Sequence, residues 1–97
     1  MMPGGFTDPR PATPEIQQIA NQVKPQLEKE VNMTYPIFNA VEYRSQVVAG
    51  TNYCIKVQVS DDEYAHLLVF RALPQEDQGP KLVRYWTGKT RYDPLEC

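Results

Sequence analysis

The spacing of apolar residues changes once along the chain, and the change separates a helical part from a β-rich part. After Thr13 and Pro14, apolar residues recur at three- and four-residue steps, the spacing of one helix face. They are Ile16, Ile19, Ala20, Val23, Leu27 and Val31. Because Thr13 suits an N-cap and Pro14 the first helical position, a helix is predicted over residues 14–31. Pro25 removes a backbone hydrogen bond and predicts a bend, with two helices meeting at Pro25 as the alternative.

Beyond Asn32 the apolar period falls to two, which is typical of strands with one buried face. Strands are predicted at residues 37–48, 52–60, 64–72 and 81–87, with a further short one near 91–93. In the second of these, Ile55 and Val57 share one face, and Cys54 falls on the opposite face, which we expect to be the wetter one. One helix followed by hairpins predicts an α+β fold, with an antiparallel sheet packed on the helix.

The segment Gln46-Val47-Val48-Ala49-Gly50 is unusual for a connection between strands, because it carries no charge and is mostly apolar. Turns that face solvent normally carry Asn, Asp or Ser. An apolar tip exposed to water is typical of a surface that binds a partner. On spacing alone two interpretations stay open: a hairpin tip at these residues, or a strand that ends at Gly50 with both valines in the core.

Length, charge and composition narrow the class of protein. The 97 residues predict a single domain over residues 1–97, in which residues 1–7 form a flexible arm because Gly4 and Gly5 leave the backbone free. A net charge of −2 argues against a nucleic-acid or anionic-membrane partner. We see neither a signal peptide nor a membrane span, so we expect a cytoplasmic protein with Cys54 and Cys97 as free thiols.

Residues for enzyme chemistry are sparse. His66 is the only histidine and lies inside a predicted strand, and the two cysteines do not have the spacing of metal ligands. Cys54 with His66 could serve as nucleophile and base, but a strand cysteine without electropositive surroundings is usually inert. We therefore predict that the protein is not an enzyme and binds neither a metal nor a cofactor.

Three apolar pieces are left unexplained by the core. They are Pro3-Gly4-Gly5-Phe6 in the arm, Val47-Val48-Ala49 at the tip, and Leu73-Pro74 in the longest loop. If consecutive strands pair as two hairpins, the tip and this loop fall at the same end of the sheet, which the arm can also reach. The three pieces would form one apolar edge. Such an edge fits a narrow cleft, like that of a protease that binds extended peptides.

At these residues the chain resembles the stefins, or type-1 cystatins, which are cytosolic reversible inhibitors of papain-like cysteine proteases. The resemblance rests on Pro3-Gly4-Gly5, on Gln46-Val47-Val48-Ala49-Gly50 continued by Thr51-Asn52-Tyr53, and on Leu73-Pro74. The helix start at 11–16 and Lys24-Pro25-Gln26-Leu27 are also similar, most of all to stefins of the A type. The similarity covers nearly the whole chain.

The resemblance implies a cystatin-like fold, in which a five-stranded antiparallel sheet wraps around one long helix. It also implies a wedge that enters the protease cleft: Pro3, Gly4 and Gly5 on the non-primed side, residues 46–50 over the catalytic cysteine, and Leu73 with Pro74 on the primed side. Tight, competitive inhibition of cathepsins L, S and H is expected, and weaker inhibition of cathepsin B. We expect a monomer that forms a domain-swapped dimer if residues 46–50 straighten.

Some residues depart from the stefin pattern. Trp86 replaces a polar residue and receives no role, and Cys54 replaces an aromatic residue and would be a site of oxidation or dimerisation. The ending at Cys97 leaves open whether the C-terminal residues pack on the sheet. A second hypothesis is a structural protein cross-linked into an epithelial envelope through Gln18, Gln22 and Lys29.

Overall fold

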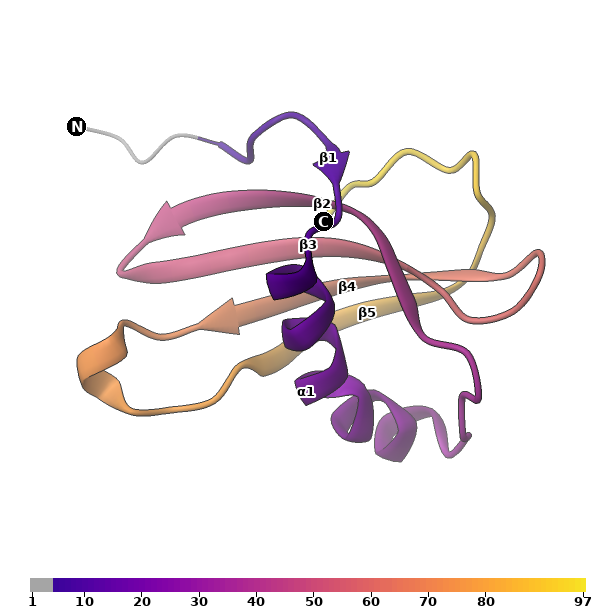
Figure 1. The fold of residues 1–97 in the computed structure, drawn as a ribbon, viewed down its shortest axis with the longest axis horizontal. Coiled ribbons are helices and arrows are strands. Elements are labelled where there is room, and N and C mark those ends of the chain that lie inside the picture. Colours follow the sequence, from indigo (N-terminus) through magenta and orange to yellow (C-terminus); the bar gives the residue numbers. More distant parts are fainter. Residues whose placement is uncertain (1–4) are drawn as a thin grey trace.

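A computed structural model describes residues 5–97, so Pro3 and Gly4 lie outside the described residues. Five antiparallel strands in the order β1-β2-β3-β4-β5 form one sheet, and a single helix crosses one face of it (Figure 1). The elements are β1 (Arg10–Pro11), α1 (Pro14–Val31), β2 (Asn39–Val48), β3 (Gly50–Gln58), β4 (Tyr64–Arg71), the 3₁₀ helix η1 (Pro74–Glu76) and β5 (Lys81–Lys89). The predicted α+β fold is therefore confirmed.

Helix α1 begins and ends where its capping residues predict. The Thr13 hydroxyl accepts a hydrogen bond from the Ile16 N–H at 3.2 Å, and Asn32 closes the helix in a left-handed conformation. The helix continues through Pro25, so the alternative of two helices is wrong. Asn21, whose carbonyl loses its partner to the proline, is exposed and can bind water. In the described part of the chain, no helix is long and apolar enough to cross a membrane.

The core lies between α1 and the inner face of the two central strands. The helix contributes its predicted apolar face, and β3 and β4 contribute alternate residues. The buried side chains on the two sides are Ile16, Ile19, Ala20, Val23 and Leu27 from α1, with Ile55, Val57, Leu67 and Val69 from the sheet. Burying each of the larger side chains stabilises the fold by about 1.5–3 kcal/mol, so this layer fixes the helix across the sheet.

Two glutamines on α1 hold the strands that flank this core. The Gln17 amide donates to the Phe38 carbonyl at 2.9 Å and accepts from the Ala40 N–H at 2.8 Å. The Gln26 amide donates to the Pro80 carbonyl at 3.1 Å and accepts from the Leu82 N–H at 2.8 Å. Each glutamine thereby satisfies backbone groups at the start of a strand. The helix thus sets where β2 and β5 begin.

The outer face of the sheet is covered by residues 90–97, which we call the strap. Cys97 of the strap forms a disulfide with Cys54 of β3, and the Leu95 side chain of the strap is buried. The prediction of two free thiols is therefore wrong. Cys54 does lie on the outer face, but it is only 1% exposed. The expectation that its side of the strand faces solvent is therefore also wrong. The strap causes both differences, and it answers the open question about the C-terminal residues.

The predicted strand near 91–93 is wrong as well. Residues 91–93 form a turn, which the Asp93 carboxylate closes by accepting hydrogen bonds from the N–H and the hydroxyl of Thr90 at 2.7 and 3.1 Å. The Lys56 ammonium group then donates to the Arg91 and Asp93 carbonyls at 2.9 and 2.8 Å. These bonds explain how a lysine can be buried in the outer face of the sheet.

Candidate functional site

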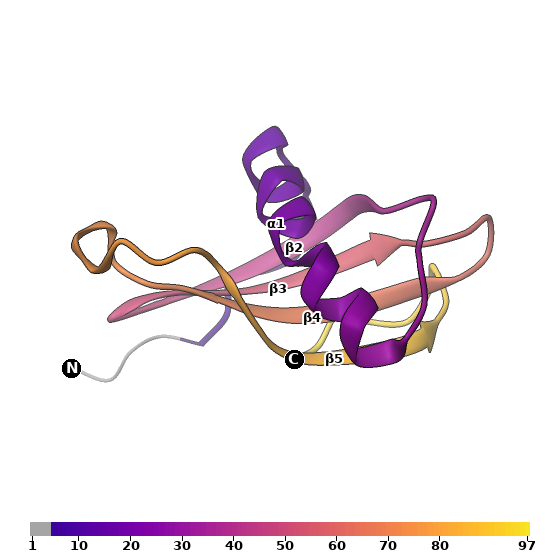
Figure 2. The same cartoon turned by 90° about the horizontal axis from the view of Figure 1, so that it is seen from below.

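The β2–β3 tip and the β4–β5 loop lie at the same end of the sheet, opposite the turn at residues 60–63 (Figures 1 and 2). The tip (residues 46–50) is a tight hairpin in which Val48 pairs with Gly50 around Ala49. Val47 is 74% exposed. The interpretation as a hairpin tip is therefore right, and the alternative with both valines in the core is wrong.

Gly50 allows the tip to lie directly against the end of β4. Its φ of +113° lies in the region that favours glycine. A Cβ atom at this position would stand 2.6 Å from the Arg71 carbonyl oxygen and 2.8 Å from the Phe70 ring. Neither approach leaves room for a methyl group. The missing side chain therefore sets the spacing between the tip and the strand that leads into the second loop.

Asn52 orients the first residue of the tip. Its amide donates to Gln46 Oε1 at 3.1 Å, across a pair in which the two residues face each other. Asn52 was quoted in the stefin-like motif but was not predicted as a site residue. The sequence does contain a signal for this contact. In a hairpin centred on Ala49, Gln46 and Asn52 are equally far from the turn and must pair.

The second loop (residues 72–80) places an apolar side chain beside the tip. Leu73, 37% exposed, precedes η1 (Pro74–Glu76), and Asp77 caps the end of η1 in a left-handed conformation. Gln26 holds the far end of the loop through Pro80 and Leu82, as described above. An open groove of about 690 Å³ lies beside the two loops and is lined in part by Gly50, Leu73 and Pro74.

The described part of the arm lies along β2. The Thr7 N–H donates to the Ser45 carbonyl at 2.8 Å, and the Ser45 N–H donates to the Thr7 hydroxyl at 3.1 Å. Arg44 donates to the Thr7 carbonyl at 2.8 Å and lies over the Phe6 ring. The segment of residues 5–7 runs toward the end of the sheet that carries the tip (Figure 1), and Gly5 is exposed. Sequence reasoning missed Arg44, whose role depends on where the strap lies.

The apolar edge contains no group that could do acid–base or metal chemistry. The tip, Leu73 and Pro74 carry no ionisable side chain, and the nearest ion pair joins Arg71 to Glu15 at 3.5 Å. His66 lies elsewhere, buried under the strap. Within residues 5–97, no cluster of three or more His, Cys, Asp or Glu could hold a metal ion. The arrangement leaves an uncharged, mostly apolar surface on the tip and at Leu73 and Pro74.

Comparison with known proteins agrees with this geometry. Residues 4–91 match the Cystatin domain family. The chain is 57% identical to Cystatin-A of Felis catus over 95 residues, which are 98% of this chain and 97% of that protein. It is 58% identical to Leukocyte cysteine proteinase inhibitor 1 of Sus scrofa over 95 residues, covering 98% and 92% of the two chains.

Stefin-C of Bos taurus is 54% identical over 92 residues, covering 95% of this chain and 91% of that protein. Similarity of this extent, over a sheet and helix arranged as the stefin resemblance implied, leaves one conclusion. The chain belongs to the cystatin family, as a type-1 cystatin of the stefin A type.

Proposed function

We propose that this protein is a reversible, tight-binding competitive inhibitor of papain-like cysteine proteases and not an enzyme. One of its relatives is named a cysteine proteinase inhibitor, and the others carry cystatin or stefin names. The observation that carries the proposal is the apolar edge. The exposed Val47 on the tip and Leu73 on the second loop lie at the same end of the sheet (Figure 1), where Gly50 lets the tip approach the end of β4.

In the proposed mechanism the edge enters the active-site cleft. Residues 46–50 lie over the catalytic cysteine, Leu73 and Pro74 contact the primed side, and Pro3, Gly4 and Gly5 occupy the non-primed side. Since no charged side chain enters the cleft, little desolvation opposes binding. Asn52 and Gln26 hold the two loops before binding, so little conformational entropy is lost. An interface of about 1,600 Å² can then bind tightly.

The proposal also covers the target proteases, the oligomeric state and the cellular location of the protein. Cathepsins L, S and H are inhibited strongly, and cathepsin B more weakly because its cleft is partly occluded. The monomer is the active form and acts in the cytoplasm. If residues 46–50 straightened so that two chains exchanged halves, the tip would be lost and the swapped dimer would not inhibit.

Titration of papain on a peptide substrate tests the proposal. The wild-type protein should inhibit stoichiometrically, and no inhibition at micromolar concentration would contradict it. Deleting residues 1–4 should raise the dissociation rate more than it lowers the association rate.

Val47→Asp places a charge on the exposed tip and should weaken inhibition by roughly tenfold or more. Val41→Asp is the matched control, because Val41 is also exposed on β2 but lies away from the tip.

A further inference from the structure

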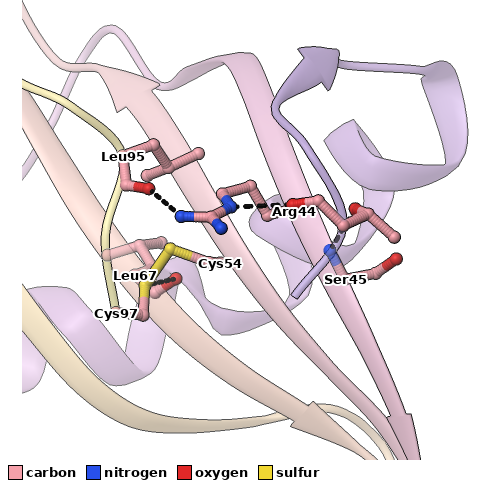
Figure 3. Close-up of a disulfide and its surroundings, with 7 residues drawn as sticks. Arg44, Ser45, Cys54, Leu67, Leu95 and Cys97 are labelled. Atoms are coloured by element: carbon pink, nitrogen blue, oxygen red, sulfur yellow. Dashed lines mark hydrogen bonds between the residues drawn. A yellow bond between two sulfur atoms is a disulfide. The ribbon is translucent and has the colours of Figure 1, made fainter. Parts of the chain in front are cut away.

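One side chain, Arg44, is bound by both the arm and the strap. Its Nε donates to the Thr7 carbonyl and its Nη1 to the Leu95 carbonyl, each at 2.8 Å (Figure 3). The guanidinium also lies 5.9 Å from the centre of the Phe6 ring. On β2, Arg44 is the direct cross-strand partner of Cys54, so it stands beside the disulfide. Among the described residues, Arg44 therefore links the arm to the strap.

The position of Leu95 depends on the disulfide. Lys56 holds the start of the strap through the carbonyls of Arg91 and Asp93. Beyond that point, residues 94–97 are held by the disulfide, the buried Leu95 side chain, the bond to Arg44, and a contact of Cys97 Sγ with the Leu67 carbonyl oxygen at 3.8 Å. Leu95 precedes Cys97 by two residues. If the bond to Cys54 were broken, the Leu95 carbonyl would keep the attachment at Asp93, two residues before it, and would lose the covalent one, two residues after it.

The disulfide can be opened from one side. Cys97 is exposed, whereas Cys54 is buried. A thiolate of a small dithiol can therefore attack Cys97 Sγ, forming a mixed disulfide there and releasing Cys54 as a thiolate that takes up a proton. The second thiol of the reagent then closes its own disulfide and frees Cys97 as a thiol. Two electrons and two protons pass to the protein, and oxidised glutathione reverses the reaction with release of two glutathione molecules.

We propose that Arg44 is a positioning residue for the arm, and that the Cys54–Cys97 disulfide regulates protease binding through it. With the disulfide closed, Leu95 fixes the guanidinium in the orientation that also binds Thr7, so Phe6 and Thr7 of the arm are ordered before the protease arrives. With the disulfide open, Arg44 loses a fixed acceptor, and more of the arm must be ordered on binding. The oxidised form then releases the protease more slowly. This inference rests on the proposed function.

The test measures binding to papain whose catalytic thiol has been carboxymethylated, because this needs no reductant. Surface plasmon resonance compares the oxidised full-length protein, the same protein after dithiol treatment, and Cys97→Ser. The reduced protein and Cys97→Ser should dissociate about three- to tenfold faster than the oxidised form, with association changed less than about twofold. Arg44→Ala should dissociate fast in both redox states, and Arg44→Lys should recover part of the slow dissociation.

A second measurement separates positioning from a general loss of stability. Without protease, hydrogen exchange of the Thr7 amide should be faster in Arg44→Ala, which keeps the disulfide, while amides in the core of α1 keep their protection. Equal dissociation rates for the oxidised protein and Cys97→Ser would overturn the inference and leave the proposed function intact. Absence of binding by every form would overturn the proposed function and the inference with it.

Discussion

At the scale of single residues, His66 is buried as a neutral imidazole between the sheet and the strap. It is 1% exposed, and its Nε2 has no hydrogen-bond partner among the described residues. Burial, and next the charges of Lys56 and Lys89, lower its pKa from 6.5 to about 4, while Asp93 opposes them weakly. Protonation would place a second buried charge beside Lys56. The only histidine of the chain thus couples stability to pH and has no place in the apolar edge.

The lowered pKa of His66 predicts an acid-sensitive fold. Because the unfolded chain binds this proton below about pH 6.5 and the folded chain only below about 4, the free energy of unfolding should be flat above pH 6.5. Between these values it should fall by up to about 3 kcal/mol. Urea denaturation at pH 7.5, 5.5 and 4.5 measures this slope, and His66→Gln should flatten it.

Asp93→Asn is the control for the His66 experiment. Hydrogen bonds from the N–H and the hydroxyl of Thr90 hold the pKa of the Asp93 carboxyl below its usual value. Its contribution to stability is therefore present at neutral pH and is lost only as the pH falls below about 4. The slope between pH 6.5 and 4 should persist in Asp93→Asn. A slope that also persists in His66→Gln would contradict the assignment.

At the scale of elements, the tip and the second loop act as one unit because β3 and β4 approach closely at Gly50. Gly50→Ala should lower the free energy of unfolding by about 1–3 kcal/mol, since the methyl group meets Arg71 and Phe70 and φ is positive. Relief of the clash moves the tip away from Leu73, so inhibition of papain should weaken by roughly tenfold or more.

Gly88→Ala separates backbone strain from the clash. Gly88 also has a positive φ, of +69°, but a Cβ there meets nothing within 4 Å. This variant should be destabilised by strain alone and should inhibit papain as the wild type does. If Gly50→Ala inhibited equally well, the close approach would have no part in shaping the apolar edge.

The elements divide into those that the sequence predicts and those that it does not. Helix α1 has one apolar face, and successive residues of strands β2–β5 point to opposite faces of the sheet, so an apolar period of 3.6 or 2 in the sequence marks each of them. The tip and second loop followed from pairing these strands. The strap has no such period, because it is held by one buried leucine, by carbonyls that accept from Lys56, and by a disulfide. The position of the strap on the outer face could not be predicted from the sequence. The contacts of Arg44 and the burial of Cys54 depend on that position, so they were not predicted either.

At the scale of the whole molecule, the disulfide joins residues 43 apart in sequence. Closing a loop of this length restricts the unfolded chain and should stabilise the fold by about 4 kcal/mol. Cys97→Ser should lose most of this, as should the wild type treated with a dithiol, and denaturant midpoints measure both. Coincident midpoints for oxidised and reduced protein would contradict the prediction.

The order of strands has a consequence for how the molecule is made. Neighbouring strands in the sheet are also consecutive along the chain, so each pairing can form soon after its second strand leaves the ribosome. Cys97 is synthesised after all of them. Because the chain contains two cysteines, no wrong intramolecular pairing competes with the native one. Oxidation therefore cannot trap a misfolded chain by scrambling, and it fastens a sheet whose strands have already been synthesised.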